Sequence, residues 1–486
     1  MLCLLPHNRL QAVYTRERRS AGRTMLNNLI DDIVTAITEA RDDHSARGIA
    51  AAIGRMITAG TLPLDARLPT VRALSKALGV SPTTVSEAWQ TLAAVGAIEA
   101  RGRLGTFVRQ PVGPGGPQRY RRVTEGPGHF ALDLSSGTPD PDLLPDLGRV
   151  VALVSRQSLT SSYLDQPVLP ELDAILRASW PFPAEDLTVV DGAMDALDRI
   201  AQVVVRLGDR VVVENPTFPP LIDLLEQLGA EVIGVDLDTE GLSVDGLRAA
   251  LLQQPTAVFL QTRAHNPTGI TMTAQRCATI SKLLADFTSI IIEDDHSGDI
   301  ASGELVSVGT HLPHRTVHIR SFSKSHGPDL RLAAVGGAGD VVSAVANRRL
   351  LGPGWSSRIL QAVLVGLLSD PATAKTLRQT RDEYARRRRL VTAVLDERHV
   401  PFTGTDGINL WMQVNDERSA LLTLAAQGIG VAPGEPFMVR DDADFLRVTV
   451  GLLQGSAAEI NAVAHRLADA AGLGGDHFGA RRLGQR

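Results

Sequence analysis

The chain has 486 residues, of which 44% are hydrophobic and 21% are charged, and its formal net charge is -5 at pH 7. This length exceeds what one hydrophobic core supports, and the composition is typical of folded globular proteins rather than disordered or fibrous chains. The net charge argues against attraction of the whole surface to nucleic acid, but it is compatible with a local basic region. Residues 65–109 form such a region, because they carry six Lys or Arg against three Asp or Glu.

The sequence predicts a cytoplasmic protein without membrane contact. The apolar start at residues 1–5 is too short for a signal peptide, and no apolar run approaches the roughly 20 residues that span a bilayer. Cys3 and Cys277 lie far apart and in no metal-ligand spacing, so we expect two reduced thiols rather than a disulfide or a zinc site.

The N-terminal part predicts three helices followed by a hairpin. Apolar residues from Ile49 to Ile57 recur at helical spacing, and a second helix is expected to begin after Pro69–Thr70. The third helix has a start signal, with Ser81 as the N-cap and Pro82 at the first helical position. Residues 98–108 hold two short β-prone runs around a basic, Gly-containing turn, which predicts a hairpin.

Residues 111–130 contain repeated Pro and Gly and few apolar side chains, which predicts a linker. Beyond it, strand-like apolar runs alternate with helical segments, so we expect an α/β fold with a mostly parallel sheet and helices on both faces. The runs are Leu187–Val190, Val211–Val213, Ala257–Gln261, Ile290–Ile292 and Thr316–Ile319. The charged run Arg386–Arg389, in a predicted helix, is interpreted as a solvated face.

The N-terminal part resembles the head domain of GntR-family regulators in three segments that occur in the same order. These segments are Leu68–Leu74, Leu78–Val85 and Gly105–Val108. The resemblance implies a winged helix-turn-helix of the α+β class whose last helix enters the major groove of double-stranded DNA. It implies DNA contacts from the helix starts and the wing, at Arg72, Ser81, Thr83, Thr84, Arg101 and Arg103. Many family members carry Arg where this chain has Pro82 and Ser86, which removes two base-reading cations.

The segment Ser321–His326 carries the strongest chemical signal. Lys324 follows the hydroxyls of Ser321 and Ser323 at the expected end of a strand and precedes Arg331. A lysine in this setting suits a Schiff base with an aldehyde cofactor whose phosphate is held nearby.

The chain from about Leu134 to Leu467 resembles class I aminotransferases of pyridoxal 5'-phosphate (PLP) fold type I. The resemblance implies that the body binds PLP and that Lys324 is the catalytic lysine that holds it. It implies phosphate contacts from a strand-to-helix turn and from the lysine segment, at Gly192, Ala193, Met194, Ser321, Ser323 and Arg331. Contacts to the cofactor ring are implied at Phe218 by stacking, at Asn266 and His296 near the phenolic oxygen, and at Asp294 beside the pyridine nitrogen.

The same resemblance assigns Arg447 to the α-carboxylate of the ligand, which an arginine holds through two parallel hydrogen bonds. Phe218 and His296 stand where the family usually has tyrosines. Phenylalanine stacks but donates no hydrogen bond, and histidine changes the group at the phenolic oxygen. Cofactor binding is compatible with both changes, whereas fast turnover is less assured.

Four potential metal ligands also lie close together in the sequence, namely Asp294, Asp295, His296 and Asp299. A metal cluster is therefore an alternative interpretation of this segment. The ordered matches around it favour the cofactor site, and no metal is expected.

A GntR-type head joined to an aminotransferase-like body resembles the MocR subfamily of bacterial regulators. The resemblance implies a cytoplasmic homodimer, nucleoid-associated when bound to DNA, that binds an operator and senses a small amino compound, with Tyr163 reaching toward the partner's phosphate. A working PLP-dependent aminotransferase that carries a DNA-binding head is one alternative, and a cofactor-free dimerising scaffold is another. The expected organisation is a partly disordered extension at 1–44, a head at 45–110, a linker at 111–130, a body at 131–470 and a disordered tail at 471–486.

Overall fold

The computed structural model describes residues 29–38, 44–58, 61–63, 65–94, 97–108, 118–124, 130–154, 162, 165–440 and 444–472. The chain divides into two compact units, which we call the head (Met1–Gly116) and the body (most of the chain from Pro117 on). The expectations of disorder at 1–28 and 473–486 fall outside the described residues, as does Cys3. In the described part, no helix combines the length and the apolar character that a membrane span requires.

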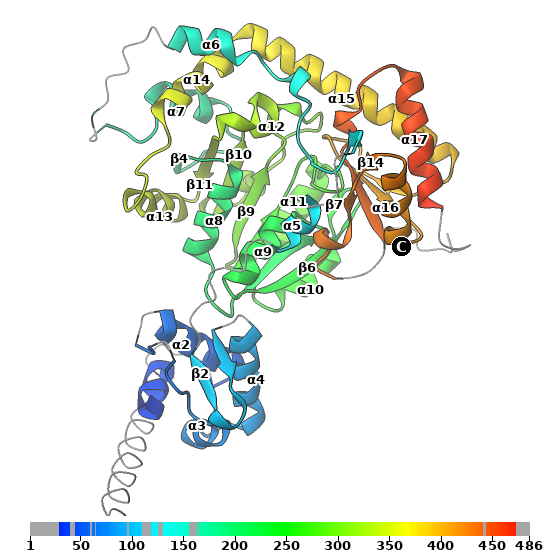
Figure 1. The fold of residues 1–486 in the computed structure, drawn as a ribbon. Helices are drawn as coiled ribbons and strands as arrows, with labels where there is room; N and C mark the ends of the chain where they lie inside the picture. Colours follow the sequence, from blue (N-terminus) through cyan, green and yellow to red (C-terminus); the bar gives the residue numbers. More distant parts are fainter. Residues whose placement is uncertain are drawn as a thin grey trace, which may run out of the picture. The chain divides into compact units, whose positions relative to one another are not determined.

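The head contains the three helices and the hairpin that the sequence predicts (Figure 1). The elements are α2 (Ala46–Thr58), α3 (Val71–Leu78), α4 (Pro82–Ala94), β1 (Ile98–Ala100) and β2 (Thr106–Val108), and residues 29–38 are also helical. The two strands pair antiparallel, with Ile98 opposite Val108. Their side chains and the inner faces of the helices, including Ile49, Leu74 and Trp89, form one core.

Capping residues set the helix boundaries of the head. Thr70 accepts a hydrogen bond from the N–H of Ala73 through its side chain, at 3.2 Å, and Gly79 ends α3 in the left-handed region with φ of 69°. Ser81 caps α4 by accepting from the N–H of Thr84 at 3.1 Å. These contacts satisfy backbone groups that a helix end leaves unpaired, so the sharp helix-turn-helix follows from local sequence.

An eight-stranded sheet forms the centre of the body, in the order β4-β11-β10-β9-β8-β5-β6-β7. The pairs from β10 to β6 are parallel, whereas β11 and β7 run antiparallel to their neighbours. The strands are β4 (Asp186–Val190), β5 (Arg210–Asn215), β6 (Glu231–Asp238), β7 (Gly241–Leu242), β8 (Ala257–Leu260), β9 (Ile290–Asp295), β10 (Thr316–Ser321) and β11 (Ala333–Gly337). The mostly parallel sheet predicted from the apolar runs is confirmed.

Helices flank this sheet (Figure 1). They are α6 (Leu147–Val154), α7 (Pro170–Ala178), α8 (Ala193–Val204), α9 (Pro219–Gln227), α10 (Val244–Leu251), α11 (Ala274–Ala285), α12 (Ser323–His326), α13 (Gly339–Leu350) and α14 (Arg358–Ser369). Helices α10 and α11 bury Leu247, Ile280 and Cys277 against strand residues such as Val258 and Ile291. The Cys277 thiol is therefore a free, buried side chain.

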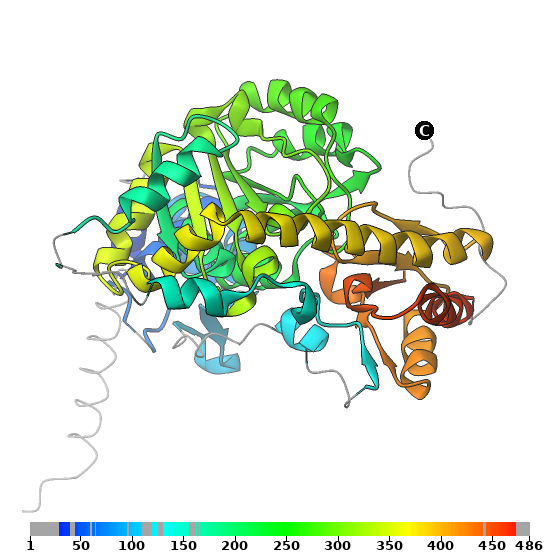
Figure 2. The same ribbon diagram turned by 90° about the horizontal axis from the view of Figure 1, so that it is seen from above.

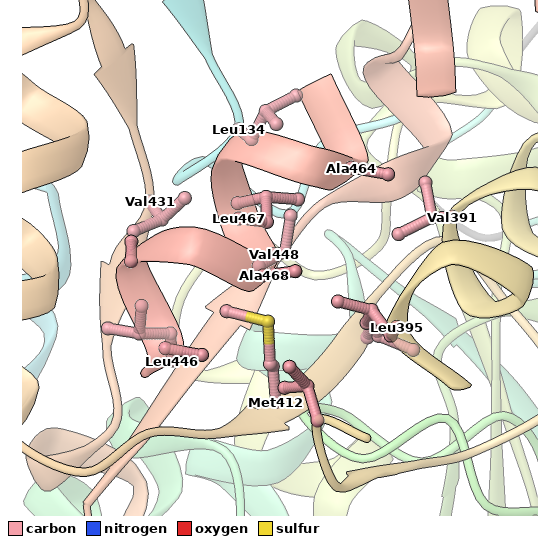
Figure 3. Close-up of a cluster of buried hydrophobic side chains, with 14 of the residues drawn as sticks. Leu134, Val391, Leu395, Met412, Val431, Leu446, Val448, Ala464, Leu467 and Ala468 are labelled. Atoms are coloured by element: carbon pink, nitrogen blue, oxygen red, sulfur yellow. The ribbon is translucent and has the colours of Figure 1, made fainter. Parts of the chain in front are cut away.

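The C-terminal part of the body has its own sheet and core. Its sheet order is β12-β13-β16-β15, and a short parallel pair joins β14 to β3. The strands are β3 (Leu132–Asp133), β12 (Phe402–Thr403), β13 (Leu410–Gln413), β14 (Ile429–Gly430), β15 (Ala432–Pro433) and β16 (Phe445–Val448), and the helices are α15 (Pro371–Glu397), α16 (Glu417–Ala426) and α17 (Ala457–Ala471). Side chains of α15, α17 and the strands meet in the core of Figure 3, where Val391, Met412 and Leu467 are among the labelled residues.

Helix α15 corrects the interpretation of the charged run Arg386–Arg389. This helix of 27 residues runs along the body (Figure 2). Arg387 is buried and pairs with the buried Asp140 at 2.7 Å. Arg388 is buried and donates to the backbone oxygens of Asn409, at 2.7 Å, and Gly407. Burial lowers the pKa of Arg388 to about 10. The prediction of a solvated face was wrong for these two residues, because tertiary contacts unrelated to sequence spacing supply their acceptors.

The predicted linker at 111–130 also contains an ordered element, α5 (Gln118–Thr124), which packs on the body. Val123 is buried against Trp411 and Phe437, and the backbone N–H of Tyr120 donates to Asp223 at 3.2 Å. The expectation that this stretch buries little fails at residues 118–124, because one apolar side chain and a few polar anchors are enough to dock this helix of 7 residues.

Candidate functional site

A pocket of about 260 Å³ lies in the body where several parallel strands end. Parallel sheets present their carboxyl ends at one edge, and ligands bind in the crevice outside that edge. The pocket brings together most of the residues expected to bind the cofactor or substrate: Ala193, Met194, Phe218, Asn266, Asp294, His296, Ser321, Ser323, Lys324, Arg331 and Arg447. Gly192 immediately precedes the two lining residues of α8, and Tyr163 lies outside the described residues.

Lys324 lies on the short helix α12 directly after β10, with its side chain in the pocket. Burial lowers the pKa of its ammonium group to about 7, and the nearby charge of Arg447 acts in the same direction, while Asp294 opposes both. An ordinary lysine is almost fully protonated at neutral pH, whereas a lysine with a pKa near 7 has a large neutral fraction there. That is the form needed for attack on an aldehyde.

Asp294 lies near the end of β9 and is buried. Burial raises its pKa to about 7, the charge of Asp295 adds to the increase, and Lys324 counteracts it. Its Oδ1 atom has no hydrogen-bond partner among the residues that the structure describes. Since an unpaired buried carboxylate oxygen is costly, this atom suits a donor on a bound molecule, such as a protonated ring nitrogen.

The turn before α8 can receive a phosphate. Gly192 has φ of 101°, and a Cβ atom there would lie 3.4 Å from Cζ of Arg331, so the position favours glycine. The first N–H groups of α8, at Ala193 and Met194, adjoin the pocket together with the guanidinium of Arg331. Backbone N–H groups at a helix start and an arginine are a combination that binds phosphate.

Asn266 and His296, the residues implied at the phenolic oxygen, also line the pocket. The side-chain oxygen of Asn266 accepts from Nδ2 of Asn409 at 3.2 Å, and its N–H donates to Gln261 at 2.7 Å. Burial holds the pKa of His296 well below its ordinary value, and the charge of Lys324 contributes, so the imidazole is neutral. Its Nδ1 atom is buried and has no hydrogen-bond partner within the described chain.

Arg447 lies on β16, is buried, and lines the same pocket. Its guanidinium lies over the ring of Phe437, with 4.9 Å between Cζ and the ring centroid, and it donates to the backbone oxygen of Ser135. Burial lowers its pKa to about 10. In the described part of the chain it forms no ion pair, and its Nε has no hydrogen-bond acceptor. A buried guanidinium without a carboxylate partner suits a carboxylate on a ligand.

Sequence reasoning missed four residues of this region. Gly137, with φ of 65°, leaves room for Arg447, since a Cβ atom there would lie 2.9 Å from its Nη1. Gln261 and Tyr120 also line the pocket. Arg349 is buried and donates to Asp195 at 2.8 Å and to Asp191 at 3.2 Å, which braces the turn before α8. Among these four residues, only Gly137 offered a sequence signal, because it is a glycine within the run Ser135–Asp140.

The metal interpretation finds little support in the geometry. Arg263 pairs with Asp295 at 2.6 Å, and Arg320 pairs with Asp299 at 3.2 Å. Both carboxylates are therefore already balanced by arginines. No group of potential metal ligands of the required kind occurs among the described side chains.

In the head, the structure places the predicted DNA contacts on exposed helix starts and on the wing. Arg72 and Thr83 are exposed, and Ser81 and Thr84 join their hydroxyls at 2.8 Å as part of the cap. Arg101 pairs with Asp65 at 2.6 Å and with Glu99 at 2.5 Å, so its charge is partly balanced. The side chain of Arg103 lies outside the described set. Sequence reasoning also missed Arg67, which is exposed and rests against Gly105 of the wing.

Together, the fold and the pocket define an aminotransferase-like body of PLP fold type I attached to a winged helix-turn-helix head. Residues 131–467 match the family described as aminotransferase class I and II, and residues 45–108 match the gntR family of bacterial regulatory proteins. The chain belongs to the MocR-type transcription regulators, in which these two families are fused, and the cofactor of its body is PLP.

Individual relatives agree with this assignment. The vitamin B6 salvage pathway transcriptional repressor PtsJ of Salmonella typhimurium is 36% identical over 430 residues, which cover 87% of this chain and 97% of that protein. The regulator TauR of Rhodobacter capsulatus is 29% identical, covering 81% and 91% of the two chains. The structure of Pyrococcus horikoshii kynurenine aminotransferase superposes with a TM-score of 0.65 at 21% identity, covering 73% of this chain and 93% of that one. This last similarity concerns the fold alone.

Proposed function

We propose that the protein acts as a homodimer in the bacterial cytoplasm, on the nucleoid, where its heads bind a double-stranded DNA operator. A small amino compound that bears a carboxylate is the proposed effector. The observation that carries this proposal is the presence, in one pocket, of the amine of Lys324 and the buried guanidinium of Arg447, which has no carboxylate partner among the described residues.

Bound PLP supplies an electrophilic aldehyde carbon that reacts with amines. Lys324 is the residue proposed to hold it, and Asp294 to keep a proton on the ring nitrogen. The phosphate is proposed to be held by Gly192, Arg331 and the hydroxyls of Ser321 and Ser323. Phe218, which lines the pocket, is proposed to stack on the ring, and Arg447 is proposed to orient the effector's carboxylate.

Exposed apolar side chains support the homodimer. Leu350, Leu351 and Ile359 are 62%, 91% and 60% exposed in the single chain, at the end of α13 and the start of α14. The three residues lie close together in the sequence, and exposed apolar surface of this kind is what a contact between two copies would cover. Tyr163 near the partner's phosphate stays part of this proposal.

The experiment that tests the proposal uses purified holoprotein and a panel of standard L-amino acids. Visible absorption of the cofactor reports binding, and fluorescence anisotropy of an operator duplex, selected from random sequences, reports DNA affinity. We expect at least one amino acid to change both signals. A change in absorption with no change in DNA affinity would refute the sensor, and sustained conversion of an amino acid with a keto-acid acceptor would favour the aminotransferase alternative.

PtsJ, which is similar to this chain over nearly its whole length, is described as a repressor of the vitamin B6 salvage pathway. Because PLP is a form of vitamin B6, this similarity favours a second candidate, in which PLP itself is the signal. In that case the apoprotein and the holoprotein differ in DNA affinity, and amino acids have no further effect. Comparing the two forms on the same duplex separates the candidates.

A further inference from the structure

Helix α5, the first described element after the head in chain order, forms part of the wall of the cofactor pocket. Tyr120 and Val123 both line it, as do Phe437 and Arg447. Only residues 109–117 separate the end of β2 at Val108 from the start of α5 at Gln118. The segment that leads to the head is therefore also a part of the ligand site.

Several specific contacts anchor α5 to the body. The backbone N–H groups of Arg119 and Tyr120 donate to the carboxylate of Asp223 at 3.1 to 3.2 Å. The side chain of Arg119 donates to the backbone oxygen of Met438 at 3.0 Å, and Arg122 pairs with Glu435 at 2.8 Å. Glu435 and Met438 flank Phe437, so the contacts hold α5 against the short segment on which Arg447 rests.

The position of Tyr120 relates it directly to Arg447. The two side chains line the same pocket, and they are close enough to interact electrostatically. Tyr120 is 42% exposed, so solvent also reaches this residue. A carboxylate held by Arg447 would therefore be near a phenol that can donate a hydrogen bond to it.

We propose that Tyr120 is an effector-binding residue that selects carboxylate-bearing amines together with Arg447, and that α5 transmits occupancy of the pocket to the head. This inference rests on the proposed amino-compound effector. A ligand that contacts Tyr120 binds more tightly when α5 is docked. By linkage it stabilises the docked state of α5 by the same free energy.

The test compares four variants of the full-length holoprotein with the wild type, using the L-amino acid panel. Tyr120→Ala and Tyr120→Phe probe the contact, Asp223→Asn weakens the docking of α5, and Arg121→Ala is a matched control on the same helix. The two signals are the amino-acid concentration at half-change of the cofactor absorption and the ratio of operator affinities with and without amino acid. Cofactor absorption and the thermal midpoint check that each variant folds.

We expect Tyr120→Ala and Tyr120→Phe to raise the amino-acid concentration at half-change by about tenfold, because each variant loses one hydrogen bond to a charged group. Asp223→Asn should retain the cofactor absorption and reduce the affinity ratio toward one, and Arg121→Ala should match the wild type. If the wild type responds to amino acids and the Tyr120 and Asp223 variants respond equally, the inference is overturned while the proposed function stands. A wild type that responds to no amino acid overturns both.

Discussion

Two groups of opposite charge type, Lys324 and Asp294, share the pocket, and loss of solvation makes each of them easier to neutralise. The pKa of the lysine falls to about 7 and that of the aspartate rises to about 7, because each charged form loses solvation. Their mutual attraction works against both shifts, so the two groups titrate as a coupled pair. The neutral form of Lys324 near pH 7 therefore depends on its desolvated position on α12, because a lysine in solvent is protonated at that pH.

This position predicts the pH dependence of cofactor attachment. Since burial lowers the pKa of Lys324 to about 7, the fraction of neutral amine rises with pH up to that value and then levels off. The rate at which apoprotein takes up PLP, followed by stopped-flow absorption, should show a midpoint near 7. A midpoint near that of a free lysine, about 10.4, would contradict the burial argument. Asp294→Asn should move the midpoint to lower pH, because Asp294 raises the pKa of Lys324.

Gly137 gives a second prediction at this scale. In Gly137→Ala the new Cβ would lie 2.9 Å from Nη1 of Arg447, so the guanidinium must move. We expect amino-acid affinity to fall by about tenfold or more while cofactor absorption stays unchanged. Gly354→Ala is the matched control, because Gly354 has a similar φ of 76° and no atom within 4 Å of its added Cβ. Equal effects of the two substitutions would show that backbone strain, not the contact with Arg447, is responsible.

The sequence predicted the pocket residues that lie in recognisable runs, among them Asp294 beside a buried strand and Lys324 after hydroxyls. It did not predict Tyr120, Arg349 or Gln261. Tyr120 and Arg349 reach the site through tertiary packing, and nothing in the neighbouring sequence marks them, whereas Gln261 ends a predicted strand-like run that carries no chemical motif. Proximity between residues far apart in the chain is a property of the fold, which explains why such contacts escape a reading of local patterns.

At the scale of elements, the sequence predicted a helix or strand best where residues at its ends mark its first and last positions. Thr70, Gly79 and Ser81 mark the ends of α3 and the start of α4, and buried parallel strands appear as continuous apolar runs. Helix α5 was missed because it is short and lies in a stretch rich in Pro and Gly. The arginines of α15 were misinterpreted because charge alone does not reveal whether buried acceptors exist.

The buried arginines of α15 predict a stability difference within one charged run. Arg387→Met leaves the carboxylate of Asp140 buried without its arginine partner, which costs about 3 to 5 kcal/mol when a buried pair is broken. Arg389→Met changes an exposed position on the same helix and should cost about 0.5 kcal/mol or less. Urea unfolding of the two variants measures the difference. Similar midpoints would mean that Asp140 is stabilised by its other hydrogen bonds.

In the head, the exposed Arg72 on α3 predicts a change in salt dependence. Removing one phosphate contact reduces the slope of log affinity against log salt by about one. Arg72→Gln should therefore weaken operator binding and flatten this slope, as measured by anisotropy over a salt series. Lys375→Gln makes the same charge change at an exposed position of the body and should leave the slope unaltered. An unchanged slope in Arg72→Gln would place Arg72 away from the DNA backbone.

For the whole molecule, thermodynamics requires that effector binding in the body and operator binding in the head affect each other equally. If an amino compound in the body changes operator affinity, operator binding must change affinity for that compound by the same factor. Coupling of this kind is typically about 5-fold to 150-fold. Neither the head alone nor the pocket alone has this property, which depends on the intact chain.

The most direct measurement compares operator affinity of the wild type and Lys324→Ala, each with and without a saturating amino acid from the panel. The wild-type affinity should change by about fivefold or more, and the variant, which lacks the amine that holds the cofactor, should show no change at an unaltered thermal midpoint. An identical amino-acid response in Lys324→Ala, or none in the wild-type holoprotein, would contradict the account.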